Sequence, residues 1–583
     1  MKSLLFAACA FALRALALPP NFLVVLSDDL EFDFKQDRLD PAIMPNLARL
    51  REAGAHLINH VAAQPVCGPS RSSLLAGRYP HNVGYRINGG AQSIAAWTAA
   101  ENNTLGTWLT ARGYHTSYLG KYVNSLEEHV PAGWTQWHGF SSGVGTYNYY
   151  NATMFDVPGP HPQPPFKQLI FTGTHQADFL GPYALRSVQA AVAAGKPFYI
   201  QVNPVMVHWG TCYGPEKQYN ATDPHWEWSL PCPESEPNCC PVNRAPGKDY
   251  ACALPIDPCP SLATAHRFDS LSNPHVPSWN ASAAGGLPDF MSHMAPITNF
   301  EEERQNAGFR NRTASAADLD RLLGVLVDGL EAAGVAEDTY IVFTSVSVCV
   351  RGVSATSPTH AKPPPIPPHP PHTHGNAPPP LHLLFRSLQD NGYHLGEHRM
   401  VFGKGQPYDT DVRLPFYVRG PGVLRNATLL HPTNHVDLTA TIVELAGATP
   451  IGPPLDGLSF AAALNGTRGP YAWRNYSFSE FFSAADTWAA LRFPLPQHRV
   501  KVHWWCTNQS EVFDIAQDAW ELNNTAQSGG AGDLARELPT LVALTRCRGG
   551  LCRHPEPQPI NDTSLPLLPC HSEQGGGGDF FDP

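Results

Sequence analysis

The chain has 583 residues, more than one compact domain usually holds, so we expect a large domain and a smaller one. Only 15% of the residues are charged, but 43% are hydrophobic, which is enough to fill a large core. The net charge of −11 argues against a protein that binds a nucleic-acid backbone through a basic surface. No apolar run of about 18 residues lies beyond the N-terminus, so the sequence predicts no membrane span.

The first 17 residues (MKSLLFAACAFALRALA) have the pattern of a secretory signal peptide. Lys2 supplies the positive start, an apolar stretch follows, and Ala15-Leu16-Ala17 is a small-x-small cleavage site. We therefore expect a secreted protein in an extracellular, cell-wall or periplasmic space, with a lysosome-like compartment as the other option.

Two further sequence features agree with secretion. Ten cysteines cluster as disulfide partners would, and they fit five bridges of undetermined connectivity. Zinc is the less favoured alternative because the spacing lacks a paired C-x-x-C. The clustered cysteines are Cys212, Cys232, Cys239, Cys240, Cys252, Cys259, Cys506, Cys547, Cys552 and Cys570. Potential N-glycosylation sites are Asn102, Asn151, Asn220, Asn280, Asn311, Asn426, Asn465, Asn475, Asn508, Asn523 and Asn561.

The pattern of elements begins with Asn21–Ser27, a continuous apolar run typical of a strand buried on both faces. Predicted helices and strands then alternate, which indicates an α/β fold with a large central mixed, mainly parallel sheet flanked by helices. The predicted helices are Met44–Ala55, Leu105–Gly113, Tyr183–Ala194, Ser315–Gly334 and Asp437–Ala446, and the predicted strands are Tyr114–Leu119, Pro197–Val202, Thr339–Ser345 and Val412–Arg419.

The large α/β domain is predicted to span residues 18–473. From Arg474 short alternating stretches predict a C-terminal subdomain with a small antiparallel sheet over residues 474–530. Residues 531–583 are rich in Gly and Pro and are predicted to form a loosely ordered tail, partly held by cysteines.

Polar residues follow several predicted strands, where ligand sites of α/β sheets lie. They are Asp28-Asp29, Lys121, His208 and the region after Ser345. Taken singly, each has a plainer explanation, such as a helix cap, a surface charge, a packed loop histidine or a turn.

The most informative motif is Val66–Arg78, VCGPSRSSLLAGR. Pro69 stands where a helix would begin, and the free backbone N–H groups of a helix start favour anions. Cys67 would lie at that positive end. For an isolated cysteine in a secreted chain, a disulfide or a buried thiol is the alternative.

In its wider context this motif resembles the signature of the sulfatase family, within the alkaline-phosphatase-like superfamily. The signature is C-x-P-S-R followed by an apolar pair and Gly. The resemblance implies that Cys67 is oxidised to Cα-formylglycine by a formylglycine-generating enzyme that reads Cys67, Pro69 and Arg71. Further matching segments extend over roughly residues 20–527: the Asp28-Asp29 pair, GYHTSYLGKYVN, NPVMVH, DNGYHLGEH, GKGQPYDTDVRLPFYVRGPG, HVDLTATIVELAGA and EVFDIAQDAWELNN.

The resemblance also implies a metal site. Its ligands would be Asp28, Asp29, Asp390 and Asn391, together with the modified Cys67. Such an all-oxygen set suits a hard cation such as Ca²⁺ much better than Zn²⁺.

The remaining matched residues imply the catalytic roles. Hydrated formylglycine is a geminal diol, of which one hydroxyl attacks sulfur and the other then expels sulfate, a route that Ser or Cys lacks. Lys121, His208 and Lys404 would bind the sulfate oxygens, and one of them would protonate the leaving alcohol. Arg71 would orient the diol.

The sequence departs from the family pattern after the signature lysine. Members often have Trp-His there, but Lys121 is followed by Tyr122-Val123-Asn124. The form GKY-x-N resembles the branch of glucosamine-6-sulfatases, heparan 6-O-endosulfatases and algal-type arylsulfatases. Without that histidine, His208 is expected to take more of the acid role.

The larger departure is the insert 346–389, where the family runs from strand to Asp-Asn-Gly without a break. These 44 residues hold eleven prolines, five histidines and no Asp or Glu, so we expect a disordered loop. Our hypothesis is a retained intron, because Val346-Ser347 and Gln389 can be encoded by splice-site consensus sequences. A genuine Pro/His-rich loop is the alternative.

The sequence therefore predicts a secreted, calcium-dependent sulfatase that hydrolyses an aryl sulfate or a sulfated sugar. The alternatives are a phosphatase or phosphodiesterase of the same superfamily, and a catalytically impaired sulfatase-like glycoprotein. The expected partners are a sulfated small molecule or polysaccharide and the formylglycine-generating enzyme, with no nucleic acid.

Overall fold

The computed structural model describes residues 19–32, 40–124, 126, 130–141, 146–158, 167–210, 258–282, 291, 294–346, 394–400, 403–467, 473–483 and 487–557. The predicted signal peptide, the insert from residue 347 on, and the Asp390-Asn391 pair lie outside these residues. Among the helices that are described, none is both long enough and apolar enough to cross a membrane.

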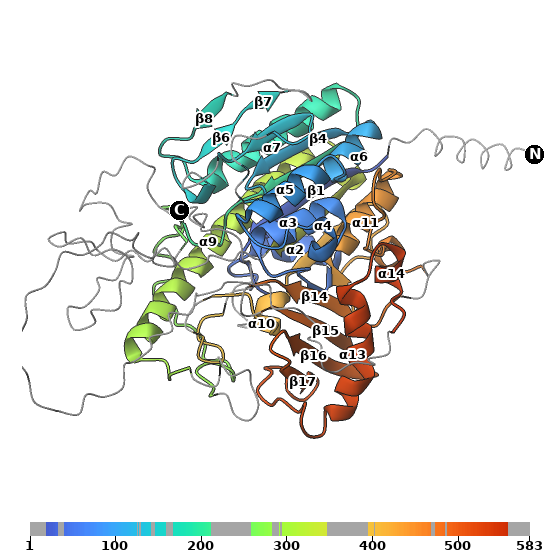
Figure 1. Cartoon of the computed structure of the whole chain (residues 1–583). Helices are drawn as coiled ribbons and strands as arrows, with labels where there is room; N and C mark the ends of the chain where they lie inside the picture. The colour runs from blue at the N-terminus through green and yellow to red at the C-terminus, as the bar shows by residue number, and fades with distance from the viewer. Residues whose placement is uncertain are drawn as a thin grey trace, which may run out of the picture.

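A nine-stranded sheet forms the centre of the large domain (Figure 1). Most of its neighbouring strands are parallel, and β11 and β7 are antiparallel to theirs. The predicted α/β class with a mixed, mainly parallel sheet is therefore confirmed. In sheet order the strands are β12 (Ala427–Leu429), β2 (Ala55–Leu57), β11 (Phe416–Arg419), β10 (Thr339–Val346), β1 (Asn21–Asp28), β9 (Phe198–Asn203), β4 (His115–Gly120), β5 (Gln136–Gly139) and β7 (Val157–Pro158).

Helices cover both faces of this sheet, because alternate residues of its strands point to opposite sides. In β1, Leu23 and Val25 belong to one core cluster, whereas Val24 and Leu26 belong to the other. The first cluster includes residues of α2 (Pro45–Ala53), α7 (Gln176–Ala193) and α9 (Asn299–Ala332), and the second includes residues of α3 (Cys67–Ala76), α6 (Leu105–Ala111) and α11 (His435–Ala446). Further elements are β3 (His60–Val61), α4 (Pro80–Val83), α5 (Ala91–Ala100), β6 (Thr153–Phe155), β8 (Gln168–Ile170), β13 (Thr433–Asn434) and α12 (Ala461–Leu464).

Several predicted boundaries differ from the structure. Helix α9 begins at Asn299 instead of Ser315, and a capping box between Thr298 and Glu301 fixes its start. Helix α7 likewise begins at Gln176. Strand β11 begins at Phe416 instead of Val412, and Val412 is the last residue of the single-turn helix α10 (Asp409–Val412).

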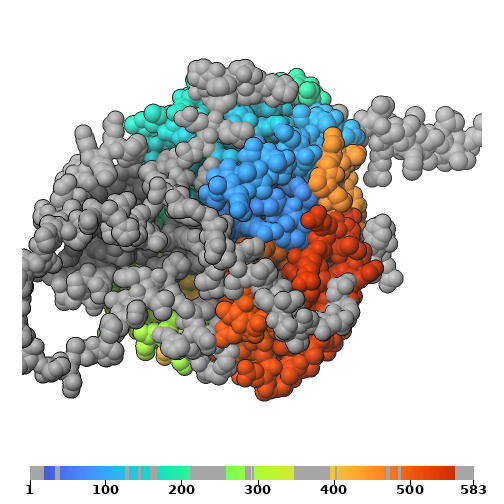
Figure 2. All heavy atoms as spheres, in the orientation of Figure 1, coloured from blue at the N-terminus to red at the C-terminus, as the bar shows by residue number. Residues whose placement is uncertain are grey.

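The C-terminal subdomain contains the predicted antiparallel sheet, with four strands in sequential order. In Figure 2 it forms an orange-to-red lobe next to the blue N-terminal helices. The strands are β14 (Ser477–Phe481), β15 (Trp488–Leu495), β16 (His498–Trp505) and β17 (Ser510–Asp514).

The prediction of a loosely ordered tail from residue 531 is wrong for residues 531–557. These residues form helix α13 (Ala531–Thr545) and helix α14 (Gly550–Arg553). Leu541 and Leu544 of α13 share a core cluster with Phe478 of the subdomain sheet. The composition misled the prediction because the glycines concentrate further along the chain, whereas α13 carries an apolar face.

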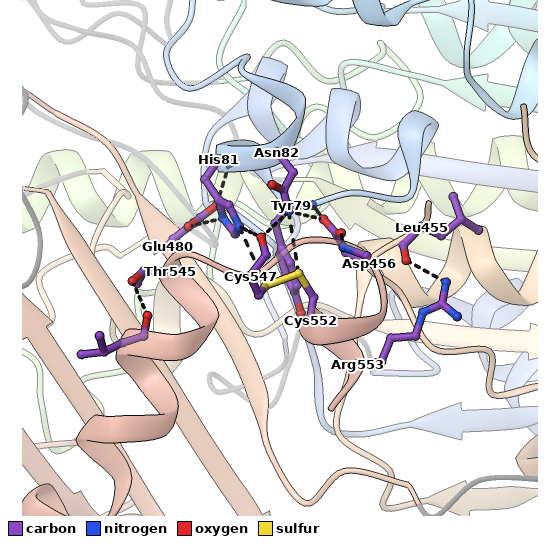
Figure 3. The surroundings of a disulfide bond; sticks show 12 residues. Tyr79, His81, Asn82, Leu455, Asp456, Glu480, Thr545, Cys547, Cys552 and Arg553 are labelled. Carbon is purple, nitrogen blue, oxygen red and sulfur yellow. Dashed lines mark hydrogen bonds and ion pairs between the residues drawn. A yellow bond between two sulfur atoms is a disulfide. The ribbon is translucent and has the colours of Figure 1, made fainter. Parts of the chain in front are cut away.

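A disulfide joins Cys547, in the turn after α13, to Cys552 of α14 (Figure 3). The turn contacts α4, because His81 Nε2 donates to the Cys547 carbonyl at 3.0 Å and His81 Nδ1 contacts Glu480 at 2.8 Å. Cys259 and Cys506 are also disulfide-bonded, so all four predicted disulfide cysteines that lie among the described residues are in bridges. Cys67, which the prediction left out, is the free cysteine of the described residues.

Removing this disulfide is expected to destabilise the C-terminal subdomain. The double variant Cys547→Ser/Cys552→Ser loses a short covalent loop, which corresponds to about 2 kcal/mol of unfolding free energy. Urea unfolding of the variant and the unaltered chain, followed by tryptophan fluorescence, measures the difference. Equal unfolding midpoints would show that the turn is held by its contacts with α4 alone.

Candidate active site

Cys67 lies in a fully buried cluster of charged side chains at the carboxyl ends of the central strands. Lys121, directly after β4, points its Nζ to Cys67 Sγ at 3.2 Å and to Asp28 Oδ2 at 2.7 Å. Arg71, one turn along α3, brings Nη2 within 3.4 Å of the same carboxylate oxygen and donates from Nη1 to the Lys121 carbonyl at 2.9 Å. None of these four side chains is more than 2% exposed.

A second group of predicted residues surrounds Asp29. Lys404 forms an ion pair with Asp29 Oδ1, and His208 Nε2 lies 3.7 Å from Asp29 Oδ2. All three side chains are fully buried. The structure thus brings together every predicted site residue that it describes: Asp28, Asp29, Cys67, Arg71, Lys121, His208 and Lys404.

The backbone around Cys67 leaves little space for other residues. Helix α3 begins at Cys67, and the Gly68 N–H donates to Asn88 Oδ1 at 3.0 Å. A Cβ atom on Gly68 would lie 2.3 Å from the Tyr85 ring, so only glycine fits there.

Burial raises the pKa of the Cys67 thiol. The unmodified side chain is therefore an uncharged thiol at neutral pH and a poor nucleophile.

The charge states of two neighbours follow from the same burial. Burial, together with the nearby cations Lys121 and Lys404, lowers the pKa of His208 well below its usual range. Its ring is therefore neutral at pH 7. Burial alone would also lower the pKa of Lys121, but the Asp28 carboxylate outweighs this effect and raises that pKa. Lys121 stays an ammonium group.

The two aspartates fit a hard divalent cation. Asp28 Oδ1 is buried and accepts no hydrogen bond from any residue that the structure describes. A buried carboxylate oxygen of this kind is costly unless a cation or a donor satisfies it. Together with Asp29 it offers oxygen ligands only, the donor chemistry that Ca²⁺ prefers. Asp390 and Asn391, the other predicted ligands, lie outside the described residues.

Asp29 also has a special backbone conformation, with φ at 65° in the left-handed region. Non-glycine residues adopt it rarely, and such strain is concentrated at functional sites. The Asp29 N–H donates to the Val346 carbonyl at 2.8 Å, and Arg312 Nη2 donates to the Asp29 carbonyl at 2.5 Å. Arg312 Nη1 also donates to the Val207 carbonyl at 3.1 Å, next to His208. Arg312 therefore ties both segments together.

Sequence reasoning missed Arg312 and two other supporting residues. Trp488 of β15 donates from its indole N–H to the Gly405 carbonyl at 2.8 Å and so holds the segment next to Lys404. The ring of Tyr147 lies 4.5 Å from Lys121 Nζ. Nothing local in the sequence marks these three residues: Arg312 lies before the predicted helix start at Ser315, and Trp488 and Tyr147 belong to no motif that the sequence singled out.

Comparison with known proteins agrees with this geometry. The family model "Sulfatase" matches residues 20–345, more than half of the chain. The chain belongs to the sulfatase family. A second model, "N-sulphoglucosamine sulphohydrolase, C-terminal", matches residues 396–546 of this sulfatase. The predicted family and the prediction of a sulfuric ester hydrolase are thereby confirmed.

Relatives and solved structures of the same kind match along most of the chain. An arylsulfatase of Volvox carteri is 28% identical over 95% of this chain and 80% of its own. The N-acetylglucosamine-6-sulfatase of Homo sapiens is 24% identical over 81% of this chain and 69% of its own. A solved structure described as a complex with its substrate D-glucosamine-2-N,6-O-disulfate has a TM-score of 0.59 at 16% identity, and the match covers 91% of this chain and 97% of that one. This last likeness concerns the fold.

Proposed function

We propose that this sulfatase hydrolyses sulfate esters through formylglycine formed from Cys67, with Ca²⁺ bound by Asp28 and Asp29. The observation that carries the proposal is the position of Cys67. Its sulfur lies 3.2 Å from the ammonium group of Lys121, within a C-x-P-x-R motif, and burial raises the pKa of the thiol, which disfavours an unmodified thiolate as the nucleophile. Modified to formylglycine, residue 67 supplies a geminal diol, of which one hydroxyl attacks sulfur and the other releases sulfate.

The cationic side chains hold the sulfate group. Lys121 and Lys404 place ammonium groups on the two sides of the aspartate pair, and Arg71 adds a guanidinium group beside Asp28. In a buried site these charges stabilise the negative oxygens of the transition state without costly reorganisation. Arg71 contacts Asp28 and the Lys121 backbone, so it also fixes the position of both partners.

The proton for the leaving alcohol comes from a lysine in this proposal. The Trp209 carbonyl can only accept, so His208 Nδ1 carries the hydrogen of their 2.5 Å hydrogen bond. In the neutral ring Nε2 is then an acceptor. The ammonium groups of Lys121 and Lys404 are the donors within reach, and His208 orients a hydroxyl group instead of supplying its proton.

Calcium completes the site in this proposal. Asp28 and Asp29 would hold the ion, with Asp390 and Asn391 as the further oxygen ligands that the family resemblance implies. When bound there, Ca²⁺ would supply Lewis-acid chemistry that polarises a sulfate oxygen. Secretion is part of the same proposal, because the four described bridge cysteines require an oxidising compartment.

Calcium binding predicts a stabilisation that can be measured without turnover. Protein treated with a chelator is expected to lose at least about 90% of its sulfate-ester hydrolysis. Added Ca²⁺ at about 100 times its Kd is expected to raise the free energy of unfolding by about 2.7 kcal/mol. Thermal unfolding with and without Ca²⁺ measures this shift.

The matched control is Asp28→Asn, which keeps the side-chain shape but removes the charge. Its unfolding temperature is expected to be insensitive to Ca²⁺. If Zn²⁺ raised the unfolding temperature of the unaltered chain and Ca²⁺ did not, the assignment of calcium would be wrong.

A further inference from the structure

Tyr147, Trp209 and Asn124 form a half-buried wall beside the sulfate-binding groups, here called the aromatic wall. The rings of Tyr147 and Trp209 are stacked, with centroids 4.9 Å apart and an angle of 16° between them. Asn124 donates from its amide to the Tyr147 hydroxyl at 3.1 Å. The proposed mechanism uses the backbone carbonyl of Trp209 but assigns no role to the side chains of these three residues.

The aromatic wall contacts the candidate catalytic residues directly. Lys121 Nζ lies 4.5 Å from the centroid of the Tyr147 ring, and the His208 ring stacks on Tyr147 at 4.8 Å. Cys67, Lys121 and His208 are fully buried, whereas Tyr147 and Trp209 are partly exposed. The wall therefore leads from the sulfate-binding groups toward the surface, where the alcohol part of a substrate must lie.

The backbone holds the wall rigidly. The Tyr149 hydroxyl donates to the His208 carbonyl at 2.5 Å, which joins the two segments that carry Tyr147 and Trp209. Gly210 packs so closely that a Cβ atom there would lie 2.4 Å from the Tyr147 carbonyl oxygen. Rigid aromatic rings bind a flat partner at low entropic cost.

Asn124 gives the wall a polar end. Its side-chain oxygen Oδ1 is buried, and no described residue donates a hydrogen bond to it. An unsatisfied buried acceptor is costly unless a ligand supplies a donor. A sugar ring offers both a C–H face for the aromatic rings and hydroxyl or amine donors for Asn124, whereas a simple aryl sulfate offers only the flat face.

We propose that the aromatic wall is the binding subsite for the alcohol part of the substrate, and that this part is a sulfated pyranose sugar. The proposal rests on the proposed sulfatase function and adds the substrate class. In this arrangement the sugar ring packs against the parts of Tyr147 and Trp209 that their mutual stacking leaves open, and one of its donors reaches Asn124 Oδ1.

The test compares a panel of glucose and glucosamine monosulfates with 4-nitrophenyl sulfate. The enzymes are the full-length chain, the form lacking residues 346–389, and the variants Asn124→Ala, Tyr147→Phe and Trp209→Ala. For Asn124→Ala, the ratio of kcat/KM for the best sugar sulfate to kcat/KM for 4-nitrophenyl sulfate is expected to fall by about fivefold to tenfold. Trp209→Ala is expected to raise KM for the sugar sulfate by about threefold to tenfold.

Tyr340→Phe is the matched control, because its hydroxyl binds the Pro421 carbonyl at 2.8 Å at the start of β10, away from the site. Its substrate ratio is expected to equal that of the unaltered chain. Tyr147→Phe keeps the ring, so it tests the polar end of the wall even if a larger change unfolds the protein.

The outcomes distinguish failure of the sugar subsite from failure of the proposed sulfatase function. An equal loss on both substrates in Asn124→Ala and an unchanged ratio in Tyr147→Phe would overturn the sugar subsite. Hydrolysis of 4-nitrophenyl sulfate without hydrolysis of any sugar sulfate would also overturn it, but would leave the proposed sulfatase function intact. Failure to cleave any of these esters would overturn the proposed function itself.

Discussion

Cys67→Ala is expected to lower sulfate-ester hydrolysis by more than about 10⁴-fold, because the variant lacks the proposed nucleophile. The thiol is buried and touches Lys121, so alanine removes the reacting group without adding bulk. Initial rates with 4-nitrophenyl sulfate measure the loss. The unfolding temperature of the variant is expected to stay close to that of the unaltered chain.

Cys67→Ser is the matched control for this experiment. Serine can attack sulfur but cannot expel sulfate from the resulting ester, because it lacks the second hydroxyl of the diol. We expect at most one turnover, followed by a stable protein that carries one sulfate group, visible by intact-protein mass spectrometry. Repeated turnover by either variant would show that residue 67 is not the nucleophile.

Deletion of residues 346–389 is expected to raise Ca²⁺ affinity and specific activity by at least about tenfold. The reason is the register of the central sheet, in which Asp28 of β1 pairs with Val346 of the parallel strand β10. In the deleted form Asp390 follows Ser345 and takes the position of Val346. Neighbouring strands lie about 4.8 Å apart, so Asp390-Asn391 would then stand beside Asp28-Asp29.

The boundaries of the family matches support this expectation, because one ends at residue 345 and the next begins at residue 396. The same deletion combined with Asp390→Ala is the control, and it is expected to bring no gain. Calorimetric titration with Ca²⁺ and initial-rate assays compare the three forms. A full-length chain that binds Ca²⁺ as tightly as the deleted form would show that the insert leaves the metal site intact.

The sequence predicted the central strands well because their environment is simple. Strand β1 is buried on both faces, so its residues form a continuous apolar run that needs no context to interpret. The first half of α9 escaped prediction for the opposite reason. Its buried face holds Arg304 and Arg312, whose charges interrupt the apolar periodicity although both side chains are buried.

The candidate site was predictable where a short motif follows a strand, as for Asp28, Lys121 and His208. The supporting residues were not, because they come from segments distant in the sequence. Trp488 reaches the Lys404 segment from the C-terminal subdomain, and Tyr147 reaches Lys121 from the loop after β5. Only the folded chain brings these partners together. The accessibility of a potential glycosylation site also depends on the fold, since Asn311 lies within α9 and is only 6% exposed.

The central claim is that residue 67 is formylglycine in the mature protein. Mass spectrometry of the tryptic peptide Glu52–Arg71, from protein secreted by a eukaryotic host, tests it most directly. The account predicts the mass of formylglycine at residue 67, with the loss of the thiol. An unmodified Cys67, found while a control sulfatase from the same cells carries the modification, would contradict it.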